Sequence, residues 1–278
     1  MPRSDVLVTT AWMAENLDTP GIRVVEVDED AEAYGALGHI PGAVALDWRT
    51  DLQSSDSRDI VGPEEFAALL SARGISPGDT VVFYGGNHNW FAAFGYWLFR
   101  YYGHADLRML DGGRMRWEME GHPFVGEVPE PEASVYPVPE PVATVRALRE
   151  DVLSGLGEDV LIDVRSVDEF TGRLLAPPHL PQEGGQQRGH IPGALSIPWN
   201  RAVARDGTFR DDEELRRTYA KALLAAEDGA RIVSYCRIGE RSSHTWFVLH
   251  EILGVDAVAN YDGSWVEYGS LIGVPVER

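Results

Sequence analysis

One loop of the sequence holds the side chains best suited to nucleophilic chemistry. It begins at Cys236, the only cysteine of the 278-residue chain, and continues through Arg237, Ile238, Gly239, Glu240, Arg241 and Ser242. The β-branched run 231–235 precedes it and a helical pattern follows it. A thiol between a strand and a helix start faces backbone N–H groups and the positive end of the helix dipole. With two arginines beside it, such a cysteine has its pKa lowered from about 8.5 to roughly 3.5–7.5, so we expect Cys236 to be a reactive thiolate.

The chain repeats itself at a spacing of 151 residues. The matching pairs are Gly38–Val44 (GHIPGAV) with Gly189–Leu195 (GHIPGAL), Val81–Tyr84 with Ile232–Tyr235, and Leu110–Gly113 with Tyr261–Ser264. Three landmarks in one register indicate a duplicated domain. In the first copy Gly85 takes the place of Cys236, and its loop, Gly85–Trp90, has neither nucleophile nor arginine. The first copy therefore cannot carry out this chemistry alone.

Strand and helix patterns alternate within each copy, which indicates an α/β fold with a mostly parallel sheet. The runs 24–27, 81–84, 160–164 and 231–235 read as buried strands, and 63–70 and 212–223 as amphipathic helices. Proline and glutamate crowd residues 125–141, as in an extended linker. We therefore expect domains at 1–122 and 144–278 joined by a linker at 123–143. The second copy carries an insertion around 174–188, expected to be a surface loop.

Composition excludes several classes of protein. The net charge of −20 repels phosphate backbones, so nucleic-acid binding is not expected. No apolar run is long enough for a membrane span and no signal peptide is apparent, which favours a cytoplasmic protein. A single cysteine excludes an internal disulfide and any multi-cysteine zinc site. The histidines show no zinc-binding spacing, and we expect His39 and His190, in the repeated motif, to be structural.

The paired GHIPGA motifs, the loop CRIGER and the terminal Tyr261–Trp265 (YDGSW) together resemble the two-domain rhodaneses, the thiosulfate sulfurtransferases. The resemblance covers essentially the whole chain. It implies two tandem rhodanese-like domains, an inactive first and a catalytic second, with the site in the cleft between them. It also implies that Cys236 carries a persulfide and that no metal or organic cofactor is needed. The partners would be a small sulfur donor and a thiophilic acceptor, cyanide or a thiol, with a protein as a further candidate acceptor.

Loops with cations after the cysteine are typical of thiosulfate-using members of that family, whereas neutral loops are typical of users of 3-mercaptopyruvate. Arg237 and Arg241 would offset the repulsion between a thiolate and a dianion, so we expect thiosulfate. Many members also place a substrate-binding arginine where this chain has Glu169, and Arg173 is the candidate replacement. Trp265 is expected to form a pocket wall. Asp163 either orients the loop or caps a turn.

Three other functions are alternatives to sulfur transfer from thiosulfate. The closest is sulfur transfer from 3-mercaptopyruvate. A sulfur carrier or binding module would load sulfur without rapid turnover. A cysteine phosphatase is disfavoured, because its motif requires arginine six residues after the cysteine and this chain has Ser242 there, with Arg241 one place too early.

Overall fold

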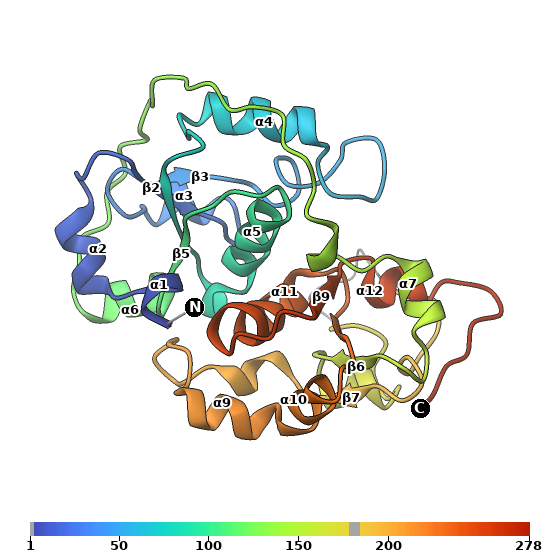
Figure 1. Ribbon diagram of the computed structural model, residues 1–278. Helices are drawn as coiled ribbons and strands as arrows, with labels where there is room; N and C mark the ends of the chain where they lie inside the picture. The colour runs from blue at the N-terminus through green and yellow to red at the C-terminus, as the bar shows by residue number, and fades with distance from the viewer. Residues whose placement is uncertain (1–2, 178–183) are drawn as a thin grey trace. The chain divides into compact units, whose positions relative to one another are not determined.

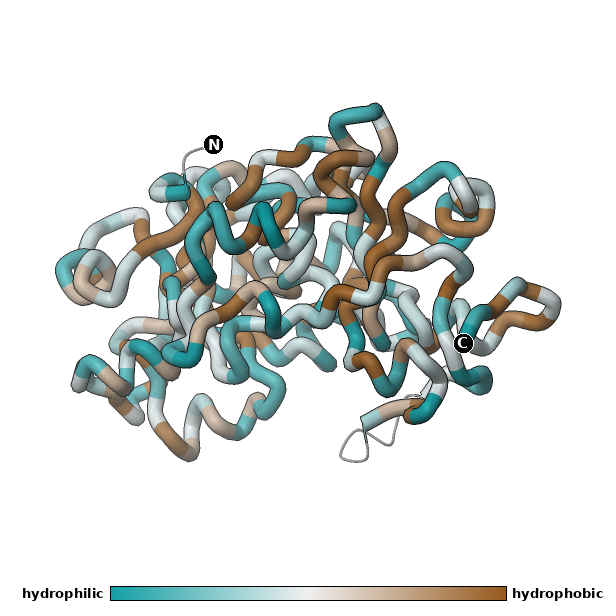
Figure 2. The backbone as a smooth tube through the Cα atoms, turned by 90° about the horizontal axis from the view of Figure 1, so that it is seen from below, coloured by the Kyte–Doolittle hydropathy of each residue, from teal (hydrophilic) through white to brown (hydrophobic). Residues whose placement is uncertain are grey.

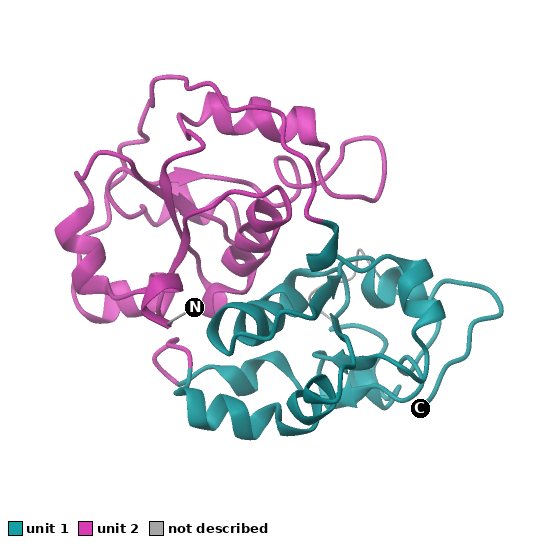
Figure 3. Ribbon diagram, viewed as in Figure 1, with its two compact units in different colours: residues 1, 143–204, 210–278 teal, residues 2–142, 205–209 magenta. Residues whose placement is uncertain are grey.

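The computed structural model describes residues 3–177 and 184–278 and divides into two compact units (Figure 3). One unit comprises the described residues up to Val142 together with Arg205–Phe209, and the other comprises Ala143–Ala204 and Arg210–Arg278. Residues 178–183 of the predicted insertion lie outside the described residues, and the described parts on either side of them contain no helix or strand.

The N-terminal unit is built on a five-stranded parallel sheet with strand order β1-β5-β4-β2-β3. Strands β2, β3 and β5 of this sheet are labelled in Figure 1. Its strands are β1 (Leu7–Val8), β2 (Ile22–Glu26), β3 (Val44–Ala45), β4 (Thr80–Tyr84) and β5 (Leu107–Leu110). Its helices are α1 (Arg3–Val6), α2 (Thr10–Asn16), α3 (Ala33–Ala36), α4 (Pro63–Ala72), the 3-10 turn η1 (Asn87–Asn89), α5 (Trp90–Tyr101) and α6 (Gly113–Met119). Residues 126–142, within the predicted linker, form neither helix nor strand.

The C-terminal unit has a four-stranded parallel sheet with order β7-β6-β8-β9. Its strands are β6 (Val160–Asp163), β7 (Leu195–Ser196), β8 (Ile232–Tyr235) and β9 (Val258–Tyr261). Its helices are η2 (Ala143–Val145), α7 (Arg149–Ser154), α8 (Val167–Phe170), η3 (Trp199–Ala202), α9 (Asp212–Thr218), α10 (Ala220–Glu227), α11 (Glu240–Phe247), the π-helical turn η4 (Val248–Ile252) and α12 (Ser264–Tyr268). The predicted fold class, two parallel-sheet α/β units, is confirmed.

One predicted helix is in fact two. The sequence pattern over 212–223 indicated a single helix, but α9 ends and α10 begins at Tyr219. Tyr219 has φ −101° and ψ 13°, outside the helical region, and its ring is completely buried. Periodicity continues across the break because both short helices bury one apolar face.

Among the described residues, no helix combines the length and apolar character that crossing a bilayer requires. Figure 2 shows hydrophobic stretches that alternate with hydrophilic ones along the chain.

Candidate active site

Cys236 lies directly after β8, where the sheet of the C-terminal unit ends and the chain turns into α11. It is completely buried. The backbone N–H of Gly239 donates to Sγ at 3.2 Å, and the thiol donates to Oε2 of Glu240 at 3.4 Å. The sulfur therefore sits at the amino end of α11, between an amide donor and a carboxylate.

Ser264, the first residue of α12, holds the backbone of the cysteine. Its Oγ accepts the N–H of Cys236 at 3.0 Å and donates to the carbonyl of Tyr261 at 2.7 Å. Ser264 has φ +53°, a conformation that a residue with a side chain rarely adopts. The N–H of Trp265 donates to the carbonyl of Cys236 at 3.1 Å. This role of Ser264 was not predicted, because nothing local in the YDGSW segment reveals the contact.

Gly239 is required for the shape of the loop. Its φ is +105°, and a Cβ there would lie 2.9 Å from Cα and Cβ of Asp262. Its carbonyl accepts from the hydroxyls of Ser242 at 3.0 Å and Ser243 at 2.8 Å, and from the amide of Asn260 at 3.2 Å. The turn is thus fixed from several sides by side chains without formal charge.

The charges around the sulfur differ from the sequence expectation. Nη1 and Nη2 of Arg241 each lie 3.2 Å from a carboxylate oxygen of Glu169, and all these groups are buried. Glu169 is held in turn by Ser166 in a capping box at the start of α8. Burial acts to raise the pKa of Glu169, but Arg241 and the hydrogen bonds of Ser166 hold it below its usual value. The arginine counted as an anion-binding group therefore already has a carboxylate partner.

The expectation of a lowered thiol pKa is wrong for the free protein. Burial, followed by the carboxylate of Glu240, raises the pKa of Cys236. Arg241 and hydrogen bonds from Ser242 act in the opposite direction but do not outweigh burial. The expectation rested on the helix dipole and the arginines alone, whereas burial and the Glu240 carboxylate act against the thiolate in the structure.

A family model for the rhodanese-like domain matches residues 9–120 and 148–271. The chain belongs to the rhodanese family. It is 54% identical over 278 residues to a Saccharopolyspora erythraea protein named "Putative thiosulfate sulfurtransferase", a match that covers 100% of this chain and 98% of that protein. It is 48% identical over 279 residues to the "Sulfur carrier protein TtuD" of Thermus thermophilus, covering 99% and 97%.

Among solved structures, the rhodanese fold of SseA from Escherichia coli, described as a 3-mercaptopyruvate sulfotransferase, is similar to this chain. The TM-score is 0.79 at 25% identity, and the match covers 93% of this chain and 98% of SseA. YnjE matches with a TM-score of 0.87 at 25% identity, covering 99% of this chain and 69% of that one.

Other predicted site residues of this rhodanese lie around the loop or away from it. Arg237 and Ile238 are buried in the loop itself. Asp163 binds the guanidinium and the backbone N–H of Arg165, so it orients that arginine at the end of β6. Arg173 is exposed, and its guanidinium lies 2.7 Å from the carboxylate of Asp168; the structure does not bring it to Cys236.

Trp265 is the residue predicted to form a pocket wall. Its side chain is buried in the hydrophobic core of the C-terminal unit, with Nε1 donating to the carbonyl of Gln187 at 3.0 Å. The guanidinium of Arg165 lies over its ring, 4.6 Å from the centroid. Trp265 therefore contacts the cysteine loop through its backbone, while its ring supports the core beneath.

The loop of the first rhodanese domain is closed by its own residues. A Cβ at Gly85 would lie 2.2 Å from the carbonyl oxygen of Val27, so no side chain fits where the second domain has its cysteine. The amide of Asn89 fills the loop, accepting the N–H of Gly85 at 3.0 Å and donating to the carbonyl of Leu110 at 2.8 Å. Asn87, His88 and Asn89 all have positive φ.

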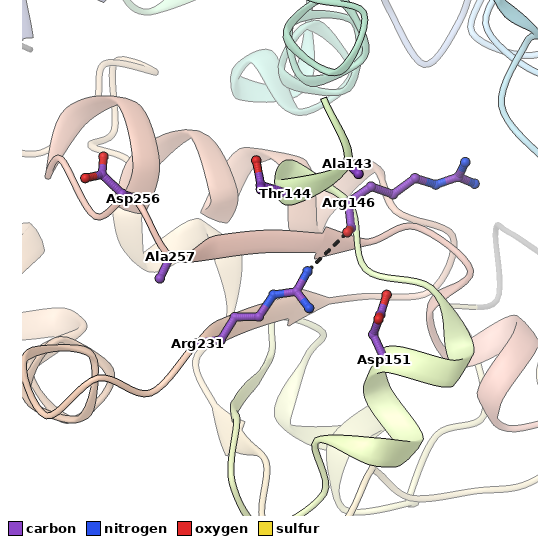
Figure 4. Close-up of a pocket in the computed structure, with 7 residues that line it drawn as sticks. All are labelled: Ala143, Thr144, Arg146, Asp151, Arg231, Asp256 and Ala257. Atoms are coloured by element: carbon purple, nitrogen blue, oxygen red, sulfur yellow. Dashed lines mark hydrogen bonds between the residues drawn. The ribbon is translucent and has the colours of Figure 1, made fainter. Parts of the chain in front are cut away.

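A separate cavity of about 610 Å³ in the C-terminal unit is lined by Ala143, Thr144, Arg146, Asp151, Arg231, Asp256 and Ala257 (Figure 4). Arg231 and Ala257 immediately precede β8 and β9, so this cavity opens at the amino ends of the strands. In Figure 4 the guanidinium of Arg231 donates to the carbonyl of Arg146. Because Cys236 lies at the opposite end of β8, we do not assign the cavity to the chemistry. Within the described ranges, no group of three or more His, Cys, Asp or Glu is placed to hold a metal ion.

Proposed function

We propose that this rhodanese is a thiosulfate sulfurtransferase that carries the transferred sulfur on Cys236, with the first domain non-catalytic. The observation that supports it most is the position of Sγ, at the carboxyl end of β8, with the Gly239 amide directed at it and α11 starting behind it. This arrangement offers N–H donors to a sulfur anion. The high identity to proteins named for thiosulfate sulfurtransfer supports the same function.

The chemistry runs in two steps, as a ping-pong mechanism. The Cys236 thiolate attacks the outer sulfur of thiosulfate, so that a new S–S bond forms, the old S–S bond breaks, and its electron pair leaves with sulfite. A thiophilic acceptor, cyanide or a thiol, then attacks the outer sulfur of the persulfide, and the Cys236 sulfur departs as thiolate. Atoms and charge balance without a redox cofactor.

The charges around the cysteine loop bear on the choice of sulfur donor. Arg237 and Arg241 favour a dianion, whereas the pairing of Arg241 with Glu169 and the presence of Glu240 reduce the local positive charge. These two carboxylates are the specific observation that keeps 3-mercaptopyruvate, a monoanion, as the second candidate donor. A sulfur-carrying role with a protein acceptor is supported by the name of the Thermus thermophilus relative.

The test is steady-state turnover of the full chain with cyanide, comparing thiosulfate with 3-mercaptopyruvate, and intact mass after each donor. We expect faster turnover with thiosulfate and a mass gain of about 32 Da, one sulfur atom, that is absent from the Cys236→Ser variant. Faster turnover with 3-mercaptopyruvate would reassign the donor. Loading without turnover would indicate a carrier. Neither loading nor turnover would contradict the proposal and leave a binding module or phosphatase.

Arg237→Gly sharpens the donor assignment. If the Arg237 guanidinium favours the dianion, its removal lowers kcat/KM for thiosulfate more than for 3-mercaptopyruvate, shifting the ratio by roughly tenfold, or about 1.4 kcal/mol. Arg173→Gly, which removes the exposed arginine paired with Asp168, is the matched control and should leave the ratio unchanged. An unchanged ratio in Arg237→Gly would remove the argument from the loop arginine.

A further inference from the structure

The carboxylate of Glu240 is the acidic group in contact with the reacting sulfur. Its Oε2 accepts the thiol hydrogen of Cys236 at 3.4 Å, and both side chains are almost fully buried. The neighbouring carboxylates are engaged elsewhere. Both oxygens of Glu169 lie against Arg241 at 3.2 Å. Both oxygens of Asp262, which abuts Gly239, accept from Arg146 at 2.8 Å.

We propose that Glu240 takes the thiol proton of Cys236 when the persulfide forms and returns it when the outer sulfur leaves, so that it is a catalytic acid and base of the sulfurtransferase reaction. The inference rests on the proposed function, and names a proton-transfer group for it. Transfer from the thiol to the carboxylate leaves the total charge of the buried pair unchanged. The pair therefore forms the thiolate without placing a second negative charge in a desolvated site.

The proton balance follows the two half-reactions. Glu240 takes the thiol proton as the Cys236 sulfur attacks the donor, and sulfite leaves with the electron pair of the broken S–S bond. Glu240 stays protonated, and so uncharged, while the persulfide carries its negative charge beside it. When the acceptor removes the outer sulfur, Cys236 departs as thiolate and takes the proton back from Glu240.

The groups around Cys236 and Glu240 favour proton exchange between these two side chains over exchange with solvent. Arg241 lies between the two glutamates, with its Nε 4.0 Å from Oε1 of Glu240. Burial and Glu240 itself raise the pKa of Cys236, so a solvent-equilibrated thiolate is scarce at neutral pH. Arg237 in the loop and the buried His244, one turn along α11, are the further ionisable groups of these elements.

The two possible roles of Glu240 predict different pH profiles for persulfide formation and opposite effects of removing its charge. If Glu240 exchanges the proton, the reactive form is a fixed fraction of the singly protonated pair, so persulfide formation is flat across the range in which the pair keeps one proton. If Glu240 only repels the thiolate, the wild-type rate rises tenfold per pH unit, and removal of the charge makes the protein faster at low pH. The two roles are thus separated by the sign of the effect.

The experiment is single-turnover persulfide formation from limiting thiosulfate, followed by intact mass between about pH 6 and 8 in wild type and Glu240→Gln. We expect a flat wild-type profile. Glu240→Gln should be about 10²-fold slower than wild type at pH 6 and rise about tenfold per pH unit, because free thiolate must then form by exchange with solvent. Glu251→Gln, which removes another buried carboxylate farther along the same helical stretch, should keep the flat profile.

Three results would overturn the inference. They are a wild-type rate that climbs tenfold per pH unit, a Glu240→Gln variant faster than wild type at pH 6, and parallel profiles for the two proteins. The first of these needs no variant, so the test survives a Glu240→Gln protein that does not fold. Failure of the wild type to load sulfur on Cys236 from any donor would instead contradict the proposed function.

Discussion

The two rhodanese domains share a hydrogen-bonded framework and differ in the loop that it supports. In each, a tyrosine at the end of the central strand accepts the N–H of the isoleucine in the GHIPGA motif: Tyr84 from Ile40 at 3.0 Å, and Tyr235 from Ile191 at 3.1 Å. The motif histidines also have matching roles. His39 stacks on Tyr34 and His190 on Phe170. GHIPGA is thus a structural motif, present where there is no nucleophile.

One interaction occurs in both domains although the arginine that makes it comes from non-equivalent positions. Arg114, from α6, pairs with Glu26 and donates to the carbonyl of Gly38 at 2.8 Å. In the second domain Arg165, which follows β6, pairs with Asp163 and donates to the carbonyl of Gly189 at 2.7 Å. The guanidinium performs the same task from different places in the chain.

The largest effect should come from Cys236→Ser. A serine hydroxyl is not ionised at neutral pH and cannot form a persulfide, so we expect sulfur transfer to fall by more than about 10³-fold. Turnover with thiosulfate and cyanide measures the loss. Circular dichroism and thermal unfolding should match wild type, since the isosteric change keeps the backbone contacts. Residual transfer above a tenth of wild type would place the nucleophile elsewhere.

Substitution of one glycine in each loop, Gly85 and Gly239, should have the next largest effect and should distinguish the two loops. Gly85→Ala puts a Cβ against the carbonyl of Val27, and Gly239→Ala puts one against Asp262 at positive φ. We expect each to lower the free energy of unfolding by about 1–3 kcal/mol. Only Gly239→Ala should also reduce turnover per folded molecule, because it moves the amide that contacts Sγ. A Gly85→Ala protein that folds but loses activity would contradict the assignment of chemistry to one domain.

A smaller and more equal pair of effects is expected from Tyr84→Phe and Tyr235→Phe. Each substitution leaves one buried isoleucine N–H without its acceptor, a loss of about 1–3 kcal/mol in stability measured by denaturant unfolding. Tyr84 also donates to Glu26, and Tyr235 is hydrogen-bonded to Asp163, so the two losses should be similar. A loss confined to one of the two variants would show that the frameworks are not equivalent.

The smallest expected effect is a difference in how the contributions of Glu26 and Glu169 to folding stability change with pH. Burial raises the pKa of Glu26 above its usual 4.5, despite Tyr84 and Arg114. Its contribution to stability is therefore fully present below pH 4.5 and is lost as the pH rises through the raised value. The pKa of Glu169 is lowered, so its contribution is present above 4.5 and is lost as the pH falls through the lowered value.

Unfolding of Glu26→Gln and Glu169→Gln across about pH 3–7 measures this difference. Relative to wild type, Glu26→Gln should gain stability as the pH rises through the raised pKa, and Glu169→Gln should gain stability as the pH falls through the lowered one. Profiles of the same sign for both variants would contradict the difference between the two sites.

Most of the fold could be predicted from the sequence, because local patterns determine it. The repeat spacing and the β-branched runs located both parallel sheets, and the strand end before Cys236 located the candidate site. The pairing of Arg241 with Glu169 could not be predicted in the same way, since it joins two helices that are distant in the chain. The one part of this interaction that the sequence indicates is the Ser166–Glu169 capping box, a serine followed three residues later by glutamate. Desolvation of Cys236 is likewise a property of packing, which no local pattern reports.

The single thiol at the base of α11 also affects how this protein withstands oxidants. An oxidised Cys236 sulfenic acid has no second cysteine in the chain with which to form a protective disulfide. Recovery must therefore come from a thiol in solution before oxidation proceeds to the irreversible sulfinic stage. Under the proposed function, the outer sulfur of the Cys236 persulfide reacts with the oxidant before Sγ does. Reductive cleavage of the persulfide S–S bond then restores the thiol. Sulfur loading would then serve as a removable shield for the nucleophile.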